Sequence, residues 1–155
     1  MLPSKHIIFG FLSSLAIILL FPQVGWLGFL IIFLSSVLID FDHYLWYVVK
    51  KKDFSLTRAY NHFIESRDLW LRLSKKQKET FESGIIIFHG IECWILLVLL
   101  IMVSKLFIFV LIGVAIHMIL DFIEMYKYNS PWHTKLSQIW VHQKNKGNRA
   151  LKGTI

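Results

Sequence analysis

The stretch VGWLGFLIIFLSSVLIDFDHYLWYVV, residues 24–49, decides the fold class of this chain. It is an almost unbroken apolar run, and a helix of about 20 such residues crosses a hydrocarbon layer of about 30 Å. In its second half the run carries Asp40, Asp42 and His43. Ionisable side chains in lipid are costly and usually functional. The stretch therefore indicates a transmembrane helix that contributes to a polar site.

Three further apolar runs have similar length, at residues 2–21, 84–103 and 106–126. Short turns at 22–23 and 104–105 pair the four runs into two hairpins, which the longer segment 50–83 connects. The fold class we predict is all-α: an integral membrane four-helix bundle of two transmembrane hairpins, forming one domain over residues 1–142. Residues 69–78 predict a short amphipathic helix at the membrane interface, and the basic tail 143–155 is expected to be flexible.

Composition and charge support a membrane location. Hydrophobic residues make up 55% of the 155 positions, against about 45–50% in soluble domains. The net charge is +7, with nine basic residues in 50–83 and six in 127–155. Because these residues flank apolar runs, we attribute them to topology and to anionic membrane lipid, and we expect no nucleic-acid partner. The positive-inside rule predicts that both termini and segment 50–83 are cytoplasmic.

The ionisable residues of the apolar runs all fall near the cytoplasmic ends of the predicted helices. His117 and Asp121 are four residues apart, and His89 and Glu92 are three apart, so each pair shares a helix face. Histidine and carboxylate are ligands of divalent metal ions. We expect a metal site with the ligands His6, Asp40, His43, His62, His89, Glu92, His117 and Asp121. The alternative is that these groups are structural, each satisfied by a hydrogen bond or paired with a cation such as Arg58.

These motifs resemble those of the membrane-bound metal-dependent hydrolases typified by a LexA-regulated bacterial inner-membrane protein. Members of that family have an early His and then a D-x-D-H element that closes an apolar helix. An R-x-x-x-H element and a late G-x-x-x-H-x-x-x-D element follow. The matching residues here are His6, then Asp40-Phe41-Asp42-His43, then Arg58 to His62, then Gly113, His117 and Asp121. The resemblance spans residues 6–121. Ile39 and Asn61 stand where the family usually has Pro and Thr.

A more distant similarity is to zinc-dependent phospholipase C and P1-type nucleases, which are all-helical enzymes with a multinuclear zinc cluster. His117 and Asp121 look like their H-x-x-x-D pair. His6 and Asp40 look like outer zinc ligands, and His62 and His89 look like the remaining histidines. This chain has no counterpart of the N-terminal Trp ligand of those enzymes. The similarity implies two or three ions, with Zn²⁺ as the expected metal.

We therefore expect an enzyme that hydrolyses a phosphoester of a lipid or lipid-like substrate with a metal-activated water. Asp42 is expected to be a base, an orienting group or a ligand, Glu92 to act in catalysis, and Arg58 to hold an anionic group with its bidentate fork. A divalent-metal or proton transporter could use the same cluster, although Lys105 is the one ionisable residue towards the far side. A di-iron oxidase is disfavoured because its E-x-x-H pairs appear here reversed. If the chain binds no metal, the remaining alternative is a structural or assembly subunit. The sequence leaves the oligomeric state open.

Overall fold

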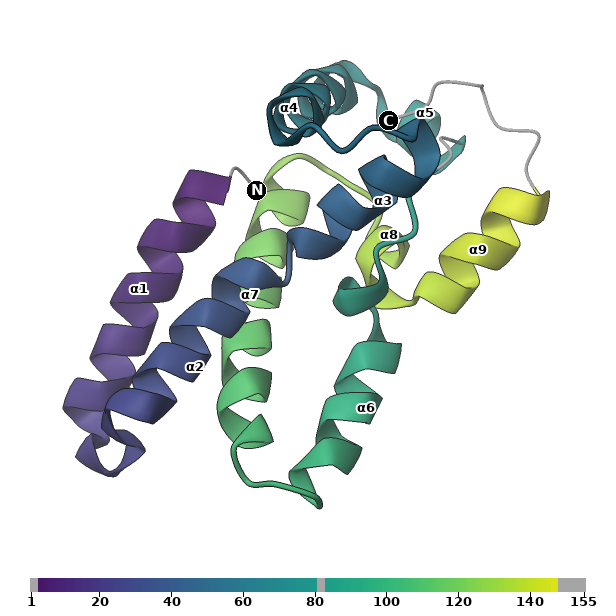
Figure 1. Cartoon of the computed structure of the whole chain (residues 1–155). Helices are drawn as coiled ribbons and strands as arrows, with labels where there is room; N and C mark the ends of the chain where they lie inside the picture. Colours follow the sequence, from purple (N-terminus) through teal and green to yellow (C-terminus); the bar gives the residue numbers. More distant parts are fainter. Residues whose placement is uncertain (1–2, 81–82, 148–155) are drawn as a thin grey trace. The chain divides into compact units, whose positions relative to one another are not determined.

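The structure is a computed structural model that describes residues 3–80 and 83–147. Within those ranges it is all-helical and contains no strand (Figure 1). Three helical stretches of the described chain are long and apolar enough to cross a membrane: α1 (Pro3–Leu20), the stretch Pro22–Lys51, and α7 (Phe107–Lys127). The chain divides into two compact units. Unit 1 comprises Met1–Asp40 and Ile91–Glu124, and unit 2 comprises Phe41–Gly90 and Met125–Ile155.

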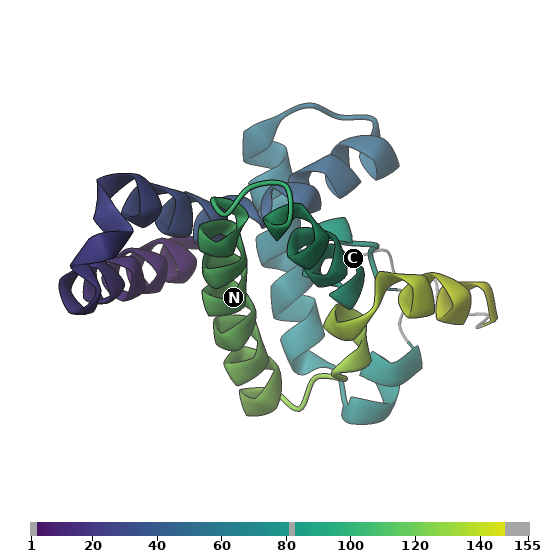
Figure 2. The same ribbon diagram turned by 90° about the horizontal axis from the view of Figure 1, so that it is seen from below.

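Unit 1 contains two pairs of consecutive helices, each pair joined by a short turn. Helix α1 turns through the short helix η1 (Pro22–Val24) into α2 (Gly25–Leu38), and the two helices lie side by side in both views (Figures 1 and 2). Helix α6 (Ile91–Ile101) leads through a turn into α7. Gly25 has φ +65°, a left-handed conformation that glycine adopts without steric cost, and this permits the tight first turn.

Small residues let the helices of unit 1 approach closely. Gly10 of α1 faces the Ser36 side chain, and Gly113 of α7 lies against Ser35 and the Ile32 carbonyl of α2. Close backbone approach through small residues is the usual packing mode of membrane helices. The buried hydroxyls of Ser14 and Ser36 donate to carbonyls of their own helices at 2.7 Å, so neither needs water. Elsewhere in the unit a hydrophobic core packs around Ile39, Leu97, Val114 and Met118.

The apolar run 24–49 is not one continuous helix. Helix α2 ends at Leu38, and α3 (Phe41–Lys51) begins after a two-residue interruption at Ile39 and Asp40. The last four carbonyls of an α-helix have no partner within the helix. The interruption therefore makes the carbonyls near Ser36 available to other donors, and one of them is used in the site described below.

The third predicted span, 84–103, is shorter in the structure. Residues 83–86 are not helical, a single 3₁₀ turn η2 covers Ile87–His89, and α6 has 11 residues. The reason is that backbone N–H groups here donate to side chains: Ile86 to Gln138 at 2.9 Å, and Phe88 to Asp42 at 2.9 Å. At about 1.5 Å per residue, α6 alone covers roughly half of a bilayer core. The predicted four-helix bundle is thus not confirmed for the described residues.

Unit 2 contains α3 and α4 (Leu56–Arg72), followed by α5 (Lys75–Thr80), α8 (His133–Leu136) and α9 (Gln138–Gly147). The predicted interfacial helix 69–78 lies across the end of α4 and the start of α5. The first five residues of the predicted flexible tail are helical, because α9 continues to Gly147, and residues 148–155 lie outside the described ranges. The Lys78 ammonium is buried and donates to the Tyr128 carbonyl at 2.7 Å, which ties α5 to the segment after α7.

Candidate metal centre

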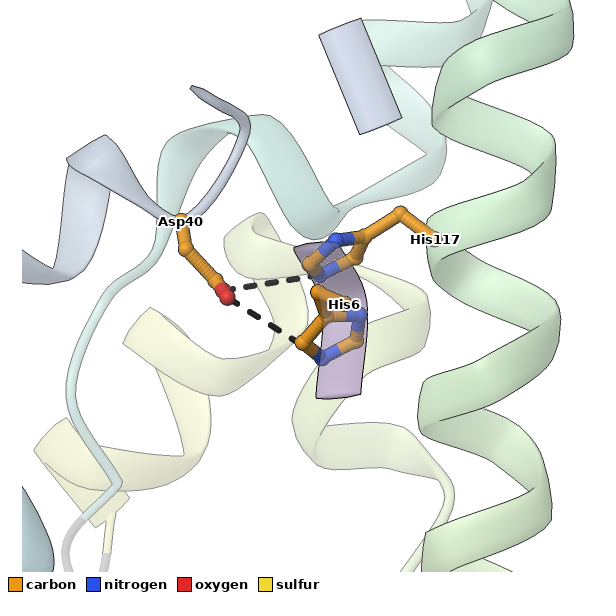
Figure 3. A group of neighbouring side chains, drawn as sticks. All are labelled: His6, Asp40 and His117. Carbon is orange, nitrogen blue, oxygen red and sulfur yellow. Dashed lines mark ion pairs between the residues drawn. The ribbon is translucent and has the colours of Figure 1, made fainter. Parts of the chain in front are cut away.

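Unit 1 brings four of the predicted ligands together. His6 comes from the first turns of α1, Asp40 follows the end of α2, and His117 and Asp121 lie one turn apart on α7. Figure 3 shows His6, Asp40 and His117 pointing toward one another. These four residues, here called the unit 1 cluster, come from α1, from the turn that follows α2, and from α7, which is distant from both in the sequence.

The ring nitrogens of the unit 1 cluster face its carboxylates at similar distances. His117 Nε2 lies 3.4 Å from Asp40 Oδ1 and 3.3 Å from Asp121 Oδ2. His6 Nε2 lies 3.5 Å from Asp121 Oδ1 and 4.0 Å from Asp40 Oδ2. These separations exceed the ordinary 2.7–3.2 Å range of N–H···O hydrogen bonds. The two imidazole rings are stacked, with centroids 3.9 Å apart and an interplanar angle of 14°, so both direct Nε2 at the same carboxylates.

This spacing fits a coordinated cation. A tetrahedral zinc ion with bonds of about 2.0–2.1 Å keeps its ligand atoms about 3.3–3.4 Å apart. His6, Asp40 and His117 each offer a ligand atom, and these atoms all lie within 4.8 Å of one another. Two histidines and two carboxylates form an acceptable first-row divalent site, and zinc is the borderline ion that binds both ligand types. The residues present therefore fit a divalent metal ion.

A backbone carbonyl fixes which nitrogen His117 offers. Its Nδ1 donates to the Ser36 carbonyl oxygen at 2.9 Å, one of the carbonyls at the interrupted end of α2. A neutral imidazole with a proton on Nδ1 carries its lone pair on Nε2. This lone pair is directed at two carboxylates, an arrangement that is repulsive unless a proton or a cation lies between them. A histidine whose other nitrogen donates to a carbonyl is the common pattern of metal-binding histidines.

His6 adds a second indication of a missing partner. Its side chain is 1% exposed, and neither ring nitrogen makes a hydrogen bond within the described part of the chain. Buried polar atoms in native proteins are almost always satisfied, and an exception calls for a specific explanation such as an ion. A cation held by the unit 1 cluster would satisfy Nε2 of His6.

Unit 2 contains a second group of predicted residues, built differently. Asp42, in the first turn of α3, is 3% exposed. Its Oδ1 lies 2.9 Å from Nδ1 of His43, and its Oδ2 lies 3.1 Å from Nδ1 of His89. The Phe88 backbone N–H donates to the same Oδ2 at 2.9 Å. We call Asp42, His43, His89 and the Phe88 N–H the unit 2 cluster.

His62 and Glu92 are the two remaining predicted ligands. His62 is on α4, where its ring stacks on Trp46 with centroids 6.3 Å apart, and Glu92 is in the first turn of α6. Among the described residues, neither belongs to a group of ligand atoms close enough to share an ion. Their roles as ligands stay predictions from the sequence.

Arg58 forms a bidentate ion pair with Asp53, a partner that was not predicted from the sequence. Its Nε and one terminal nitrogen donate to the two carboxylate oxygens of Asp53, each at 2.7 Å. Asp53 also accepts from the Tyr47 hydroxyl at 2.7 Å and from the Ser55 N–H at 3.0 Å. Beside Arg58 the pKa of the Asp53 carboxyl lies well below its usual range, and the pKa of Arg58 is raised. The predicted anion-binding fork is thus occupied by a carboxylate of the chain itself.

The contacts that sequence reasoning missed are mostly backbone groups. The Ser36 carbonyl and the Phe88 N–H carry no side-chain signal by which a sequence could mark them. Asp53 could have been identified from the sequence, since an Asp two residues before a helix-capping Ser is typical of an Asx-turn.

Comparison with family models, curated proteins and solved structures finds no match to this chain.

Proposed function

We propose that this chain is a membrane-embedded, metal-dependent hydrolase that cleaves a phosphoester of a lipid or lipid-like substrate. The observation that carries the proposal is the unit 1 cluster, in which Nε2 of each of two imidazoles lies 3.3–4.0 Å from an oxygen of each of two carboxylates. Three of these four side chains are almost fully buried. Buried carboxylates without compensating positive charge are strongly destabilised. A divalent cation supplies that charge at the separation that the ligand atoms already have.

The residues of the unit 1 cluster would hold the ion, and zinc is the metal we propose, with two or three ions over the whole chain. A bound divalent cation supplies Lewis acidity and lowers the pKa of water to about 7. The chain itself contributes the ligand geometry, the Ser36 carbonyl that orients His117, and the exclusion of bulk water from His6 and Asp121. The resemblance of the sequence motifs to membrane-bound metal-dependent hydrolases supports hydrolysis as the reaction class.

We also propose that the chain crosses the membrane as two hairpins, α1 with the 22–51 stretch and residues 84–103 with α7, where residues 84–90 would complete the crossing that α6 covers by half. Exposed apolar side chains on every one of these helices support contact with lipid, among them Leu19, Leu27, Leu99 and Ile119. Both termini and segment 50–83 would be cytoplasmic, because basic residues concentrate there. In a Cys93→Ser background, Lys75→Cys should react with a membrane-impermeant maleimide in inverted vesicles and not in intact cells. Labelling only from outside would contradict this topology.

The proposal is tested by measuring metal content and turnover on one preparation. Protein purified in detergent without chelator should contain at least one equivalent of a transition metal. It should hydrolyse a phosphodiester or phospholipid substrate in mixed micelles, and dialysis against a chelator followed by zinc should remove and restore this activity. Metal at well below one equivalent would contradict the metal centre. Stoichiometric metal with zinc uptake into sealed vesicles and no cleavage of any phosphoester would favour a transporter instead.

A further inference from the structure

Three donors converge on the Asp42 carboxylate. Nδ1 of His43 approaches Oδ1 at 2.9 Å, while Nδ1 of His89 and the Phe88 N–H approach Oδ2 at 3.1 and 2.9 Å. An ionised carboxylate only accepts hydrogen bonds, so each histidine that meets it through Nδ1 must carry its proton there. The carboxylate is 3% exposed, so water does not compete effectively for these contacts.

We infer that Asp42 is a positioning residue that fixes both His43 and His89 as Nδ1–H tautomers, so that each presents the Nε2 lone pair for metal coordination. Histidines that bind metals commonly donate their other ring N–H to a carboxylate, which sets the tautomer and ring orientation. Here a single carboxylate does this for two rings, whose centroids lie 5.0 Å apart at an angle of 72°. Of the roles that the sequence left open for Asp42, the contacts favour orientation over action as a base.

The two oxygens of Asp42 are not equivalent, and this gives the inference a specific signature. Oδ2 receives the Phe88 N–H, a donor that cannot change into an acceptor. In an Asp42→Asn variant, the amide oxygen is expected to occupy the Oδ2 position and the NH₂ group the Oδ1 position, where it faces His43. His43 must then accept through Nδ1 and carry its proton on Nε2, while His89 keeps its proton on Nδ1. The isosteric change should thus switch one histidine and spare the other.

The inference rests on the proposed function, because a fixed Nε2 lone pair serves coordination, but its first readout needs no metal. We would label the full chain with [¹⁵N]histidine in detergent and identify the tautomers from two-bond ¹H–¹⁵N correlations, assigning His43 and His89 with His→Gln variants. Wild type should show both as Nδ1–H. Asp42→Asn should switch His43 only, and Asp42→Ala should release both. Asp68→Asn, which removes an exposed carboxylate of unit 2, should change neither.

A zinc titration followed at the same ¹⁵N resonances supplies the second readout. Asp42→Asn should raise the zinc concentration at half-saturation of His43 by about 10–100-fold, the usual cost of losing an orienting group. An Nε2–H tautomer for either histidine in the wild type overturns the inference whether or not the variants fold. Unchanged zinc response of His43 after its tautomer has switched also overturns it and leaves the proposed function standing. If the wild type shows both histidines as Nδ1–H tautomers but binds no zinc, the proposed function is contradicted and the positioning role of Asp42 stands.

Discussion

The two clusters use the same residue types and differ in which histidine nitrogen faces the carboxylate. In the unit 1 cluster Asp40 and Asp121 face Nε2 of His6 and His117 at 3.3–4.0 Å. In the unit 2 cluster Asp42 faces Nδ1 of its two histidines at 2.9 and 3.1 Å. The second distances are those of hydrogen bonds, and the two shortest of the first match the separation of about 3.3–3.4 Å between two ligands of a tetrahedral zinc ion.

This difference separates two roles that carboxylates have at metal centres. A carboxylate can face the ring nitrogen that carries the lone pair, as Asp40 and Asp121 face Nε2 of His117. In the proposed metal centre such a carboxylate would bind the ion itself. A carboxylate that accepts the Nδ1 proton holds the ring and leaves coordination to Nε2. Asp40 and Asp42 are the same residue type and lie two positions apart in the sequence, so neither residue type nor sequence position distinguishes these roles.

The largest effect is expected from removing a ligand of the unit 1 cluster. His117→Ala and Asp121→Asn should each abolish phosphoester hydrolysis and lower the zinc content by at least one equivalent, because each removes a ligand atom directed at the ion. His142→Ala should change neither property, since His142 is exposed on α9. Elemental analysis of the three variants measures the effect. If His142→Ala loses metal and His117→Ala retains it, the site lies elsewhere.

An intermediate effect is expected from Gly113→Ala, which tests how the unit 1 cluster is held in place. A Cβ at Gly113 would meet the Ser35 side chain and the Ile32 carbonyl, and it would push α7 from α2. Such overpacking usually costs about 1–3 kcal/mol, and His117 lies one turn further along α7, so its contact with the Ser36 carbonyl should weaken.

Unfolding in SDS–detergent mixtures and zinc affinity would be measured together for Gly113→Ala. Ile119→Ala, on the exposed side of the same helix, is the matched control and should leave zinc affinity unchanged. Wild-type stability and affinity in Gly113→Ala would show that close approach of α7 and α2 is not required.

The smallest effect is expected at Asp53 and Arg58, which lie outside both clusters. The pKa of Asp53 is lowered in the folded state, first by Arg58 and then by Tyr47. The stability it contributes is therefore present above the ordinary aspartate pKa of about 3.9 and is lost as the pH falls from there through the folded-state pKa. The stability difference between wild type and Asp53→Asn should be small at pH 6 and should shrink further below pH about 3.9.

Substitutions of Asp53 and Arg58 also test whether Arg58 binds substrate. If the pair only joins α3 to α4, Arg58→Gln and Asp53→Asn should have equal, small effects on kcat/KM. A rise in KM for Arg58→Gln that Asp53→Asn does not share would assign substrate binding to Arg58 and return it to the site.

The sequence predicted the class of the fold and the kinds of residue at the centre because both depend on side-chain pattern. Apolar length predicted α1 and α7, which are long and apolar enough to cross a membrane. The four-residue spacing of His117 and Asp121 predicted that they share a face of α7. Asp40 and His43 are three residues apart, which puts two side chains on one face only in a continuous helix. The helix is interrupted at Ile39 and Asp40, so this spacing does not apply. His89 and Glu92 do not lie on one continuous helix either, since η2 ends at His89 and α6 starts at Ile91.

What the sequence did not predict depends on backbone hydrogen bonds between segments distant along the chain. The Phe88 N–H donates to Asp42, 46 positions earlier, and His117 donates to the Ser36 carbonyl, 81 positions earlier. These contacts shorten α6 and fix the tautomer of His117. No residue identity marks such a donor or acceptor, because every residue except proline offers both.

X-ray absorption at the zinc edge would measure whether the unit 1 cluster coordinates a divalent metal ion. The measurement would use full-length protein loaded with one equivalent of zinc and compare it with His117→Ala. Coordination by the unit 1 cluster predicts only nitrogen and oxygen neighbours at about 2.0–2.1 Å, with the outer-shell scattering of two imidazoles in the wild type and of fewer in the variant. A sulfur neighbour at about 2.3 Å, which would implicate Cys93, or an identical imidazole signal in His117→Ala would contradict it.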